Sequence, residues 1–471
     1  MNLPIFIPSS GSEIVVDLFA GGGGASEGIR MALGRDPDVA INHDPEAIAM
    51  HAENHPETRH LIEDVWTVDP HWATKGRPVS LLWASPDCTH HSKAKGGAPN
   101  RDDKRRSLAC VITDKWIPAT WPETIIMENV EEFVDWGPLD ASGCIIESAR
   151  GDTFRWFLRR IRRYGYRVEY RELRACDYGA PTIRKRLFLI AKKNHGPVVW
   201  PEPTHGPGRP LPYLTAADCI DWSLPCPSIF GRKKPLADAT CRRIAKGIVR
   251  YVINNPNPFI VNPNHTSAYY NAFRGQCIDT SFQNATQIPD MDLVMPFLVK
   301  NYGGVVGHGI RKPLGTITAI DHHSLVAAHM VKLRGTCRDG QRVDVPAPTI
   351  TASGTHVGLV YAFLLKYYGQ DQVISPDNPL HTVTTKDRFG LVTVIVRGAE
   401  YVIADIGLRM LQPRELFRAQ GFPESYKIDH VSGRILTKKA QVRMCGNSVC
   451  PQVASALIKS NVLSIQHQKV I

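Results

Sequence analysis

The sequence predicts an α/β protein whose main domain is doubly wound, with a second, β-rich domain inserted in it. Short apolar runs alternate with helical patterns through the first 193 residues, which is typical of a buried parallel sheet with helices on both faces. The strand-like runs lie at residues 13–19, 39–42, 79–85, 124–130 and 185–191. Four glycines, Gly21–Gly24, follow the first run directly, where a ligand could approach the backbone.

Three helices between these strands have clear signals. The first ends at Gly34, and the second begins with Asp44 as its N-cap and Pro45 as its first residue. The third, within residues 152–166, has arginines on one face and apolar side chains on the other. Its apolar face consists of Phe154, Phe157, Leu158 and Ile161. The arginines could contact phosphate, but a solvated polar face is the commoner role, and we expect it here.

The second domain begins where the composition changes. Residues 195–213 are too rich in proline for a helix or a central strand, so we place a boundary after Lys193. Beyond it, an internal repeat begins at Leu293, Leu325 and Leu359, with a period of 32 to 34 residues. Each unit reads as a strand, a turn and a Thr-x-Thr strand, which predicts a β-rich domain built by duplication.

Helical patterns return after Leu408, in PRELFRAQGF and PQVASALIKSNVL. We therefore expect one domain from residues 1–193 plus 408–471. The other domain would span residues 194–407, with the repeats at about 293–392. A lysine stands at the same place in each repeat, namely Lys300, Lys332 and Lys366. A recurring cation near a turn is either solvated or placed to neutralise phosphate, and the sequence leaves both alternatives open.

Composition restricts the function classes. With 471 residues, of which 43% are hydrophobic and 21% charged, the chain has the length of two globular domains. Its net charge of +11 favours a polyanionic partner, most often nucleic acid, although many basic proteins bind none. Because the sequence has no apolar run of about 18 residues and no leader pattern, we expect neither a membrane span nor export. The eleven cysteines include no CxxC pair, which indicates reduced thiols in a cytosol.

A metal site is not predicted. The stretch HAENH, His51–His55, spaces two histidines by four residues, but it is not HExxH. We expect these histidines to lie on a solvated helix face rather than to bind zinc.

The glycine run does not match two familiar nucleotide sites. It lacks the Gly-Lys-Ser/Thr of a phosphate-binding P-loop, and its glycines are out of register with GxGxxG, so a dinucleotide site is weakly supported. The remaining interpretation is a small adenosine ligand that lies across the strand ends, with Phe19 beside it.

Reactive side chains follow three later strands. Cys88 comes directly after a strand and close to two lysines, so it is either a buried structural cysteine or a nucleophile with a favoured thiolate. Glu128 ends another strand, as a cap or as a proton donor. Arg184 and Arg186 stand two residues apart, hence on one strand face, where they could bind a polar ring or a phosphate.

In this order and spacing the motifs resemble those of the DNA (cytosine-5) methyltransferases, over roughly residues 13–193 and 408–460. DLFAGGGG is similar to the family's first motif, which holds S-adenosylmethionine, and SPDCTHHS is similar to its Pro-Cys loop. ENV matches the family's glutamate motif, and TIRKRLFLIA its Arg-x-Arg strand. GNSV, Gly446–Val449, resembles the last motif, which completes the cofactor pocket, and RELFRAQGFPESY resembles the motif that organises the recognition domain.

The resemblance implies the site residues. The implied catalytic residues are Cys88 as nucleophile, Glu128 at the cytosine ring, Arg184 and Arg186. The implied cofactor-binding residues are Phe19, Ala20, Gly21, Gly22, Gly23, Asn42, His43, Asp64, Val65, Pro86, Asn447, Ser448 and Val449. The chain departs from the family at four positions, with Thr89 and Thr182 where glutamines are usual, His91 in place of an aromatic residue and Asn42 in place of an acidic one.

We therefore expect a DNA cytosine-5 methyltransferase with a Rossmann-like catalytic domain and an inserted target-recognition domain. S-adenosylmethionine is the implied cofactor, double-stranded DNA the implied partner, and a cognate restriction endonuclease a second candidate partner. We expect a cytoplasmic monomer with no membrane contact. An RNA cytosine-5 methyltransferase and a noncatalytic DNA-binding protein on the same fold stay open as alternatives. A nicotinamide oxidoreductase fits less well, because it would require neither Cys88 nor ENV.

Overall fold

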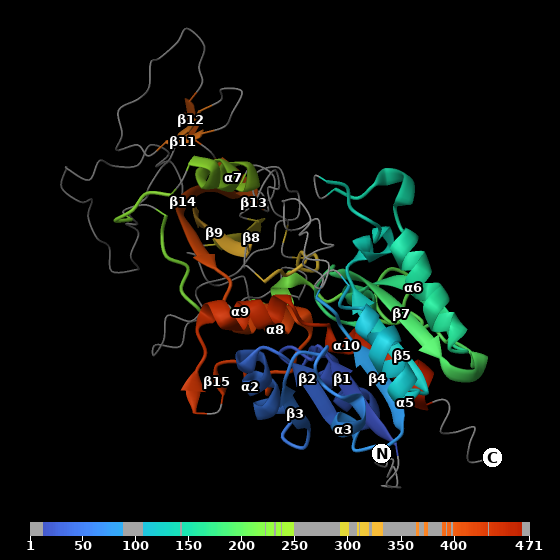
Figure 1. Ribbon diagram of the computed structural model, residues 1–471. Coiled ribbons are helices and arrows are strands. Elements are labelled where there is room, and N and C mark those ends of the chain that lie inside the picture. The colour runs from blue at the N-terminus through green and yellow to red at the C-terminus, as the bar shows by residue number, and fades with distance from the viewer. Residues whose placement is uncertain are drawn as a thin grey trace, which may run out of the picture. The chain divides into compact units, whose positions relative to one another are not determined.

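The described residues of the computed structural model form two compact units (Figure 1). Unit 1 consists of Met1–Cys219, Pro313–Ile320 and Gln412–Ile471, and unit 2 consists of Ile220–Lys312 and Asp321–Leu411. The structure describes residues 13–87, 107–141, 144–221, 223–229, 232–236, 238–248, 293–300, 309, 311–319, 323–332, 364–366, 372–374, 389–391, 393–396, 399–431 and 433–463. Within these residues, no helix is long and apolar enough to cross a membrane.

Unit 1 is built on a seven-stranded sheet with the order β3-β2-β1-β4-β5-β7-β6. Its strands are β1 (Ile14–Leu18), β2 (Val39–Asn42), β3 (Arg59–Ile62), β4 (Val79–Ala84), β5 (Thr124–Asn129), β6 (Arg167–Arg174) and β7 (Lys185–Lys192). The five strands β3, β2, β1, β4 and β5 are parallel to one another. The five runs predicted from the sequence are β1, β2, β4, β5 and β7, and the two strands that the sequence missed, β3 and β6, lie at the sheet edges.

The sheet is mixed, so the prediction of a parallel sheet is wrong for β7. β7 pairs antiparallel with both β5 and β6. The physical reason is the connection between β6 and β7, which contains only a short 3-10 turn at Ala175–Tyr178 and no crossover helix. β7 still reads as a parallel strand in the sequence because its central residues are buried on both faces.

Helices cover both faces of this sheet, as expected for a doubly wound α/β fold (Figure 1). One face packs against α5 (Ile117–Thr120), the π-helical turn before it and α6 (Asp152–Arg163), and the other against α1 (Gly24–Leu33) and α10 (Pro451–Ile458). Unit 1 also contains α2 (Pro45–Asn54), α3 (Pro70–Thr74), α8 (Pro413–Gln420), α9 (Lys438–Gly446) and the short strands β15 (His430–Val431) and β16 (Arg434–Ile435). The α/β class predicted from the sequence is confirmed.

The helix ends predicted from the sequence are present in the structure. Gly34 caps α1 with a φ of 71°, and the Asp44 side chain accepts hydrogen bonds from two backbone amides at the start of α2. The predicted apolar face of α6 is buried. Helix caps act through contacts with neighbouring residues of the same helix, so the sequence alone is enough to predict these helix ends.

Residues 194–219 group with unit 1, whereas the composition placed a boundary at Lys193. Two hydrogen bonds between the Asn461 side chain and the backbone of Val199 fasten this proline-rich segment to unit 1. Tyr178 adds a third, from its hydroxyl to the carbonyl of Pro201. Side-chain contacts therefore assign the segment to a unit in spite of its composition.

Unit 2 is rich in strands. Its four-stranded antiparallel sheet has the order β13-β14-β9-β8, and a three-stranded sheet has the order β11-β10-β12. The elements are α7 (Asp238–Ile248), β8 (Leu293–Lys300), β9 (His323–Lys332), β10 (Leu364–Lys366), β11 (Gln372–Ile374), β12 (Phe389–Leu391), β13 (Thr393–Val396) and β14 (Ala399–Met410).

The predicted repeats are partly described. Their first strands correspond to β8, to β9 from Leu325 onwards and, in the described part of the third unit, to β10, while residues 333–363 lie outside the described residues. In the first repeat the Thr-x-Thr stretch, Thr316–Thr318, is not a strand and belongs to unit 1. Its neighbour Leu314 forms a bridge with Thr182, so this stretch pairs with unit 1 instead of completing a hairpin.

Candidate active site

The glycine turn lies at the topological switch point of the unit 1 sheet. β1 has β2 on one side and β4 on the other, and the chain order reverses between β1 and β4. Ligands of open α/β sheets bind at the carboxyl ends of the strands at this point. Phe19, directly after β1, has a φ of 61°, a conformation that costs free energy in an aromatic residue and tends to persist at functional sites.

The glycines of the turn have different surroundings. A Cβ at Gly22 would touch the side chains of Met50 and Met444, and a Cβ at Gly24 would lie 2.0 Å from Ser448 Oγ. A Cβ at Gly21 would meet, within 4 Å and among the described residues, only the carbonyl oxygen of Phe19, at 3.8 Å. Gly21 therefore faces open space beside the strand ends, whereas the following glycines let the protein itself pack closely.

The other predicted cofactor residues lie at the ends of neighbouring strands and in one later loop. Asn42 ends β2 and its side-chain oxygen accepts a hydrogen bond from the Asp44 amide, at 2.8 Å. Asp64 follows β3, is exposed and accepts a hydrogen bond from the Trp66 amide. Ala20, Val65, Pro86, Ser448 and Val449 are buried, whereas His43 and Asn447 are exposed.

A buried carboxyl group and a guanidinium meet at the end of β5. Glu128 pairs in register with Phe188 of β7, so its side chain leaves the sheet on the same face as that of Arg186. Arg186 Nε lies 3.3 Å from Glu128 Oε1. Burial raises the pKa of Glu128, although the nearby guanidiniums of Arg186 and Arg184 act in the opposite direction. Burial at this site thus disfavours the charged form of the carboxyl group.

The end of β5 is also tied to the loop that carries the predicted nucleophile. Asn129 donates a side-chain hydrogen bond to the carbonyl of Pro86, at 3.2 Å. Cys88 follows Pro86 by two residues, and Cys88, Thr89 and His91 lie outside the described residues. The described part of the site therefore extends to within one residue of the predicted nucleophile, at Asp87.

Arg184 is placed differently from Arg186. It is buried, and its Nη1 group donates to the carbonyls of Ile317 and Gly446, at 3.0 and 3.1 Å. A Cβ at Gly446 would lie 2.1 Å from the backbone of Thr318, so three distant stretches of unit 1 meet here. Sequence patterns did not reveal the participation of residues 313–320, because the same residues matched a repeat.

Beneath the glycine turn lies a buried polar network, and the prediction that the HAENH histidines are solvated is wrong. His51 and His55 are both 0% exposed. Ser26 donates to Asp17 Oδ2 at 2.7 Å, and His51 Nε2 contacts Ser26 Oγ at 2.8 Å. His51 Nδ1 contacts His60 Nε2, also at 2.8 Å. Burial, reinforced by the other two histidines, lowers the pKa of His51, so this ring is neutral.

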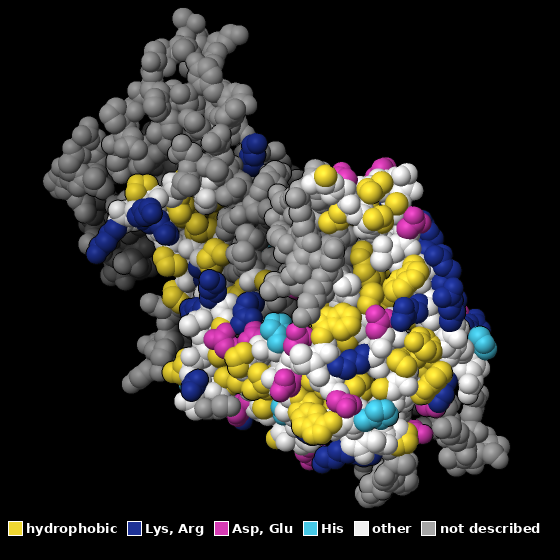
Figure 2. Space-filling model, viewed as in Figure 1, with side chains coloured by type: hydrophobic (Ala, Val, Ile, Leu, Met, Phe, Trp, Pro, Cys, Tyr) yellow, Lys and Arg dark blue, Asp and Glu magenta, His cyan; other side chains and the backbone are white. Residues whose placement is uncertain are grey.

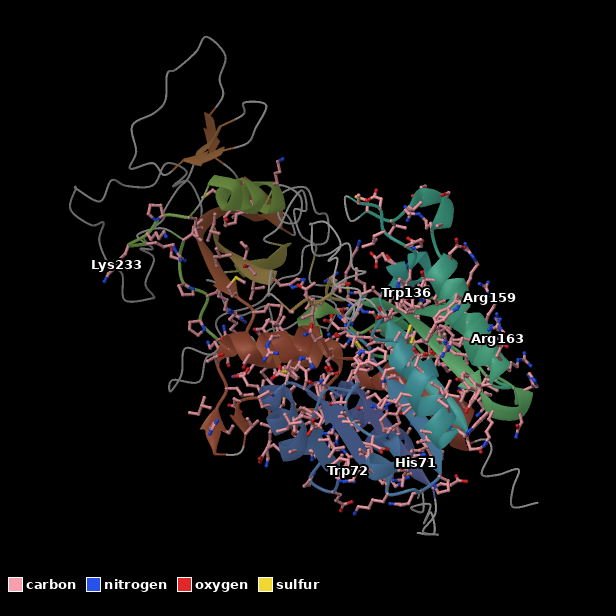
Figure 3. All side chains as sticks on the ribbon, in the orientation of Figure 1. His71, Trp72, Trp136, Arg159, Arg163 and Lys233 are labelled. Carbon is pink, nitrogen blue, oxygen red and sulfur yellow. The ribbon has the colours of Figure 1, made fainter. Side chains whose placement is uncertain are left out.

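The arginines of α6 point outward. Figure 3 shows Arg159 and Arg163 projecting away from the sheet, and Figure 2 shows a row of basic side chains at the edge of unit 1 formed by α6. Arg155 pairs with Asp152, and Arg160 with Asp114. This arrangement agrees with the predicted polar face of the helix.

The doubly wound sheet of unit 1 thus carries a glycine turn at its switch point and a buried carboxyl group at the end of the nearby strand β5. The sequence profile of the C-5 cytosine-specific DNA methylases matches residues 14–206 and 322–462. The chain therefore belongs to the C-5 cytosine-specific DNA methylase family, which confirms the family and the enzyme class predicted from the sequence.

Individual relatives agree with this family. The type II methyltransferase M.AquIA of Picosynechococcus sp. is 28% identical over 222 residues, which is 44% of this chain and 87% of the relative. The type II methyltransferase M.AgeI of Thalassovita gelatinovora is 29% identical over 199 residues, 41% of this chain and 43% of the relative. The DNA (cytosine-5)-methyltransferase 3 of Arabidopsis thaliana is 22% identical over 96% of this chain and 31% of its own length. The chain thus spans less than half of the last two relatives.

Proposed function

We propose that the protein transfers a methyl group from S-adenosylmethionine to C5 of a cytosine in double-stranded DNA. The observation that carries the proposal is Glu128, a buried carboxyl group with a raised pKa, 3.3 Å from Arg186 at the switch-point edge of the sheet. Membership of the cytosine-5 DNA methylase family supports the same reaction.

The chemistry requires three side chains around one base. Cytosine C5 is too weak a nucleophile to take a methyl group unaided, so the Cys88 thiolate forms a bond to C6 and shifts electron density towards C5. Glu128 supplies a proton at N3, where charge develops during this attack. Arg186 orients the ring through its O2 atom. After methyl transfer a base removes the C5 proton, the C6–S bond breaks to regenerate the thiolate, and N3 returns its proton to Glu128.

The residues at the switch point fit the cofactor. Gly21 leaves open space at the end of β1, Asn42 ends the adjacent strand β2, and Ser448 and Val449 pack against the glycine turn. S-adenosylmethionine, when bound, supplies an electrophilic methyl group. Because the reacting carbon is inaccessible within a duplex, the target base leaves the stack, at a cost of about a few kcal/mol.

We propose unit 2 as the target-recognition domain and double-stranded DNA as the partner of the whole chain. The type II methyltransferases among its relatives support a role beside a cognate restriction endonuclease. We expect the enzyme to act as a monomer in the cytoplasm.

Expression in a host that lacks DNA methylation, followed by bisulfite sequencing, tests the proposal. The wild type should protect cytosines in one sequence context, and Cys88→Ala should protect none while it still binds S-adenosylmethionine. Cys144→Ala is the matched control, because Cys144 is an exposed free cysteine, and it should behave as the wild type. Unmethylated DNA from the wild-type strain, with soluble protein present, would refute the activity.

A second assay tests the covalent step. A duplex that carries 5-fluorocytosine at the target position should form a gel-stable adduct with the wild type, since fluorine blocks the final elimination. The adduct should be absent with Cys88→Ala and present with Cys144→Ala. An adduct that persists in Cys88→Ala would identify another nucleophile.

A further inference from the structure

We propose that Tyr426 is a positioning residue for cofactor binding, because its hydroxyl fixes the carbonyl of Gly22 and thereby the shape of the glycine turn. The inference rests on the proposed function, since it takes the turn as the S-adenosylmethionine site. Tyr426 lies 404 residues beyond Gly22 in the chain, in a loop after α8, and neither composition nor spacing connects the two.

The contact is direct and buried. Tyr426 Oη donates to the carbonyl oxygen of Gly22 at 2.6 Å, and Tyr426 is 1% exposed. His55 Nε2 lies 3.4 Å from the same hydroxyl. A Cβ at Gly23 would lie only 2.1 Å from Tyr426 Oη, so the third glycine of the turn is needed to admit this hydroxyl. Burial raises the pKa of Tyr426, which keeps the hydroxyl protonated and able to donate.

Tyr426 is itself held firmly. Its carbonyl accepts a hydrogen bond from Arg414 Nη1 at 2.7 Å, and its ring packs against Phe417 and Phe422. The next residue, Lys427, exchanges two backbone hydrogen bonds with the side chain of Asn54 on α2, both at 2.8 Å. A rigid loop thus presents the hydroxyl to the turn.

The turn needs such an anchor because two of its residues are glycines, whose backbone is free to adopt other conformations, and a third, Phe19, is held in a costly one. Phe19, Gly21 and Gly23 all have positive φ values, of 61°, 53° and 94°. Without the hydroxyl, the buried carbonyl of Gly22 would have to rotate towards another donor or remain unpaired. Apparent affinity falls in proportion to the fraction of molecules in the binding-competent conformation, so a turn that samples other shapes binds its ligand more weakly.

Tyr426→Phe tests this role in the full-length protein. The variant keeps the ring and removes only the hydroxyl, so the dissociation constant for S-adenosylmethionine, measured by calorimetry, should rise about tenfold. The KM for S-adenosylmethionine should rise by a similar factor, while kcat at saturating cofactor should change by less than about twofold, because the anchored shape is restored once ligand is bound.

Tyr166→Phe is the matched control. Tyr166 is also 1% exposed, and its hydroxyl donates to a backbone carbonyl, that of Pro122, at 2.7 Å. This variant should lose comparable thermal stability but keep wild-type cofactor affinity. Equal affinities of Tyr426→Phe and Tyr166→Phe would overturn the inference, as would a loss of kcat without a change in affinity.

A second variant covers the case in which Tyr426→Phe does not fold. Asn54→Ala leaves the hydroxyl in place but releases Lys427, and it should weaken cofactor binding in the same direction by a smaller factor. Wild-type affinity in folded Asn54→Ala, together with unfolded Tyr426→Phe, would count against the anchor. Failure of the wild type itself to bind S-adenosylmethionine would instead refute the proposed function.

Discussion

At the scale of single residues, Glu128 shows how burial and charge compete at the proposed site. Two guanidiniums nearby favour its carboxylate, and Arg186 is close enough for an ion pair. Desolvation acts in the opposite direction and is the larger effect, so the pKa of Glu128 is raised. A carboxyl group that holds its proton more tightly than in water suits proton delivery to a ring nitrogen.

Glu128→Gln should therefore lower kcat by about 10²- to 10⁴-fold while DNA affinity changes little. The amide can still contact the ring edge, but it cannot deliver a proton. Glu131→Gln is the control, because Glu131 follows Glu128 by three residues, is half-exposed and pairs with Lys185. Single-turnover rates and DNA dissociation constants for both variants decide the matter. Equal losses of binding and turnover in Glu128→Gln would make Glu128 a structural cap.

The raised pKa of Asp17 leads us to expect that the stability of the protein depends on pH. It is fully buried in β1, and burial raises its pKa to about 7, against the hydrogen bond from Ser26. The folded protein then holds the proton more tightly than the unfolded chain, so this contribution to stability is complete below about pH 4 and is lost as the pH rises through 7. The span corresponds to about 4 kcal/mol at most.

Asp17→Asn should remove this dependence, because an amide does not titrate. Urea unfolding at pH 5.5 and 7.5 measures it: the free energy of unfolding at pH 5.5 minus that at pH 7.5 should be smaller in the variant than in the wild type. A difference that persists undiminished in Asp17→Asn would assign it to other groups. His51 and His60 belong to the same network, and their lowered pKa values contribute in the opposite direction, because the unfolded chain binds their protons more tightly than the folded protein.

The residue scale also shows the limit of sequence interpretation. Glu128 could be located at a strand end because β5 is a continuous apolar run. The burial of His51 and His55 could not be predicted, because a polar helix face is ordinarily solvated and only tertiary packing places it beneath the glycine turn. The contact between Tyr426 and Gly22 was missed for the same reason: Tyr426 ends the motif RELFRAQGFPESY, but Gly22 lies 404 residues away.

At the scale of elements, the two ends of α1 show two separate reasons for a glycine, namely close packing and a left-handed backbone conformation. Gly24 has ordinary backbone geometry, but a Cβ there would overlap Ser448 Oγ and the carbonyl of Val449, at 2.0 and 2.3 Å. Gly34, at the other end of α1, has a φ of 71° with no described atom within 4 Å of its Cβ position. The two glycines of one helix are thus required for different physical reasons.

Alanine at these two positions should have different consequences. Gly34→Ala should cost about 1–2 kcal/mol of stability, from the left-handed backbone alone, and leave cofactor affinity unchanged. Gly24→Ala should displace the Ser448–Val449 loop, cost about 3 kcal/mol and weaken S-adenosylmethionine binding. Thermal denaturation and calorimetry on both variants measure these effects. Unchanged affinity in folded Gly24→Ala would show that the loop is not part of the cofactor site.

Strand prediction succeeded where burial was high and failed at the edges. The edge strands β3 and β6 contain many charged and polar residues, as in RVEYRELR, so their alternation is weak. The direction of β7 could not be predicted either, because an apolar run does not show which strand it pairs with or in which direction. Its hairpin-like link to β6 decides this, and no local signal marks that link.

At the scale of the whole molecule, unit 1 is assembled from three stretches of chain that are far apart in the sequence. The stretch Pro313–Ile320 returns from within the insertion, and its carbonyl at Ile317 accepts a hydrogen bond from Arg184. The composition could indicate that two units exist, because the repeats and the proline-rich segment differ from the rest. The composition could not indicate that residues 313–320 belong to unit 1, because this depends on a few hydrogen bonds.

The pairing within unit 2 gives the last prediction. Lys300 and Lys332 are the final residues of β8 and β9. Since these strands are antiparallel, Lys300 lies opposite His323, while Lys332 lies opposite Tyr401 at the other end of β9. Nine residues of strand separate the two positions, about 30 Å. A duplex that contacts one end of this sheet therefore reaches one lysine position and not the other.

One of the variants Lys300→Gln and Lys332→Gln should thus reduce the slope of log affinity against log salt by about one, and the other should leave it unchanged. The loss should be equal for cognate and noncognate DNA, because phosphate contacts position a protein without specifying sequence. Lys459→Gln, the same charge change at the end of α10 in unit 1, controls for net charge. DNA affinities across a salt series for the three variants give the answer. Two reduced slopes would require a duplex that runs along the strands, and two unchanged slopes would leave β8 and β9 as scaffold and move DNA contact elsewhere in unit 2.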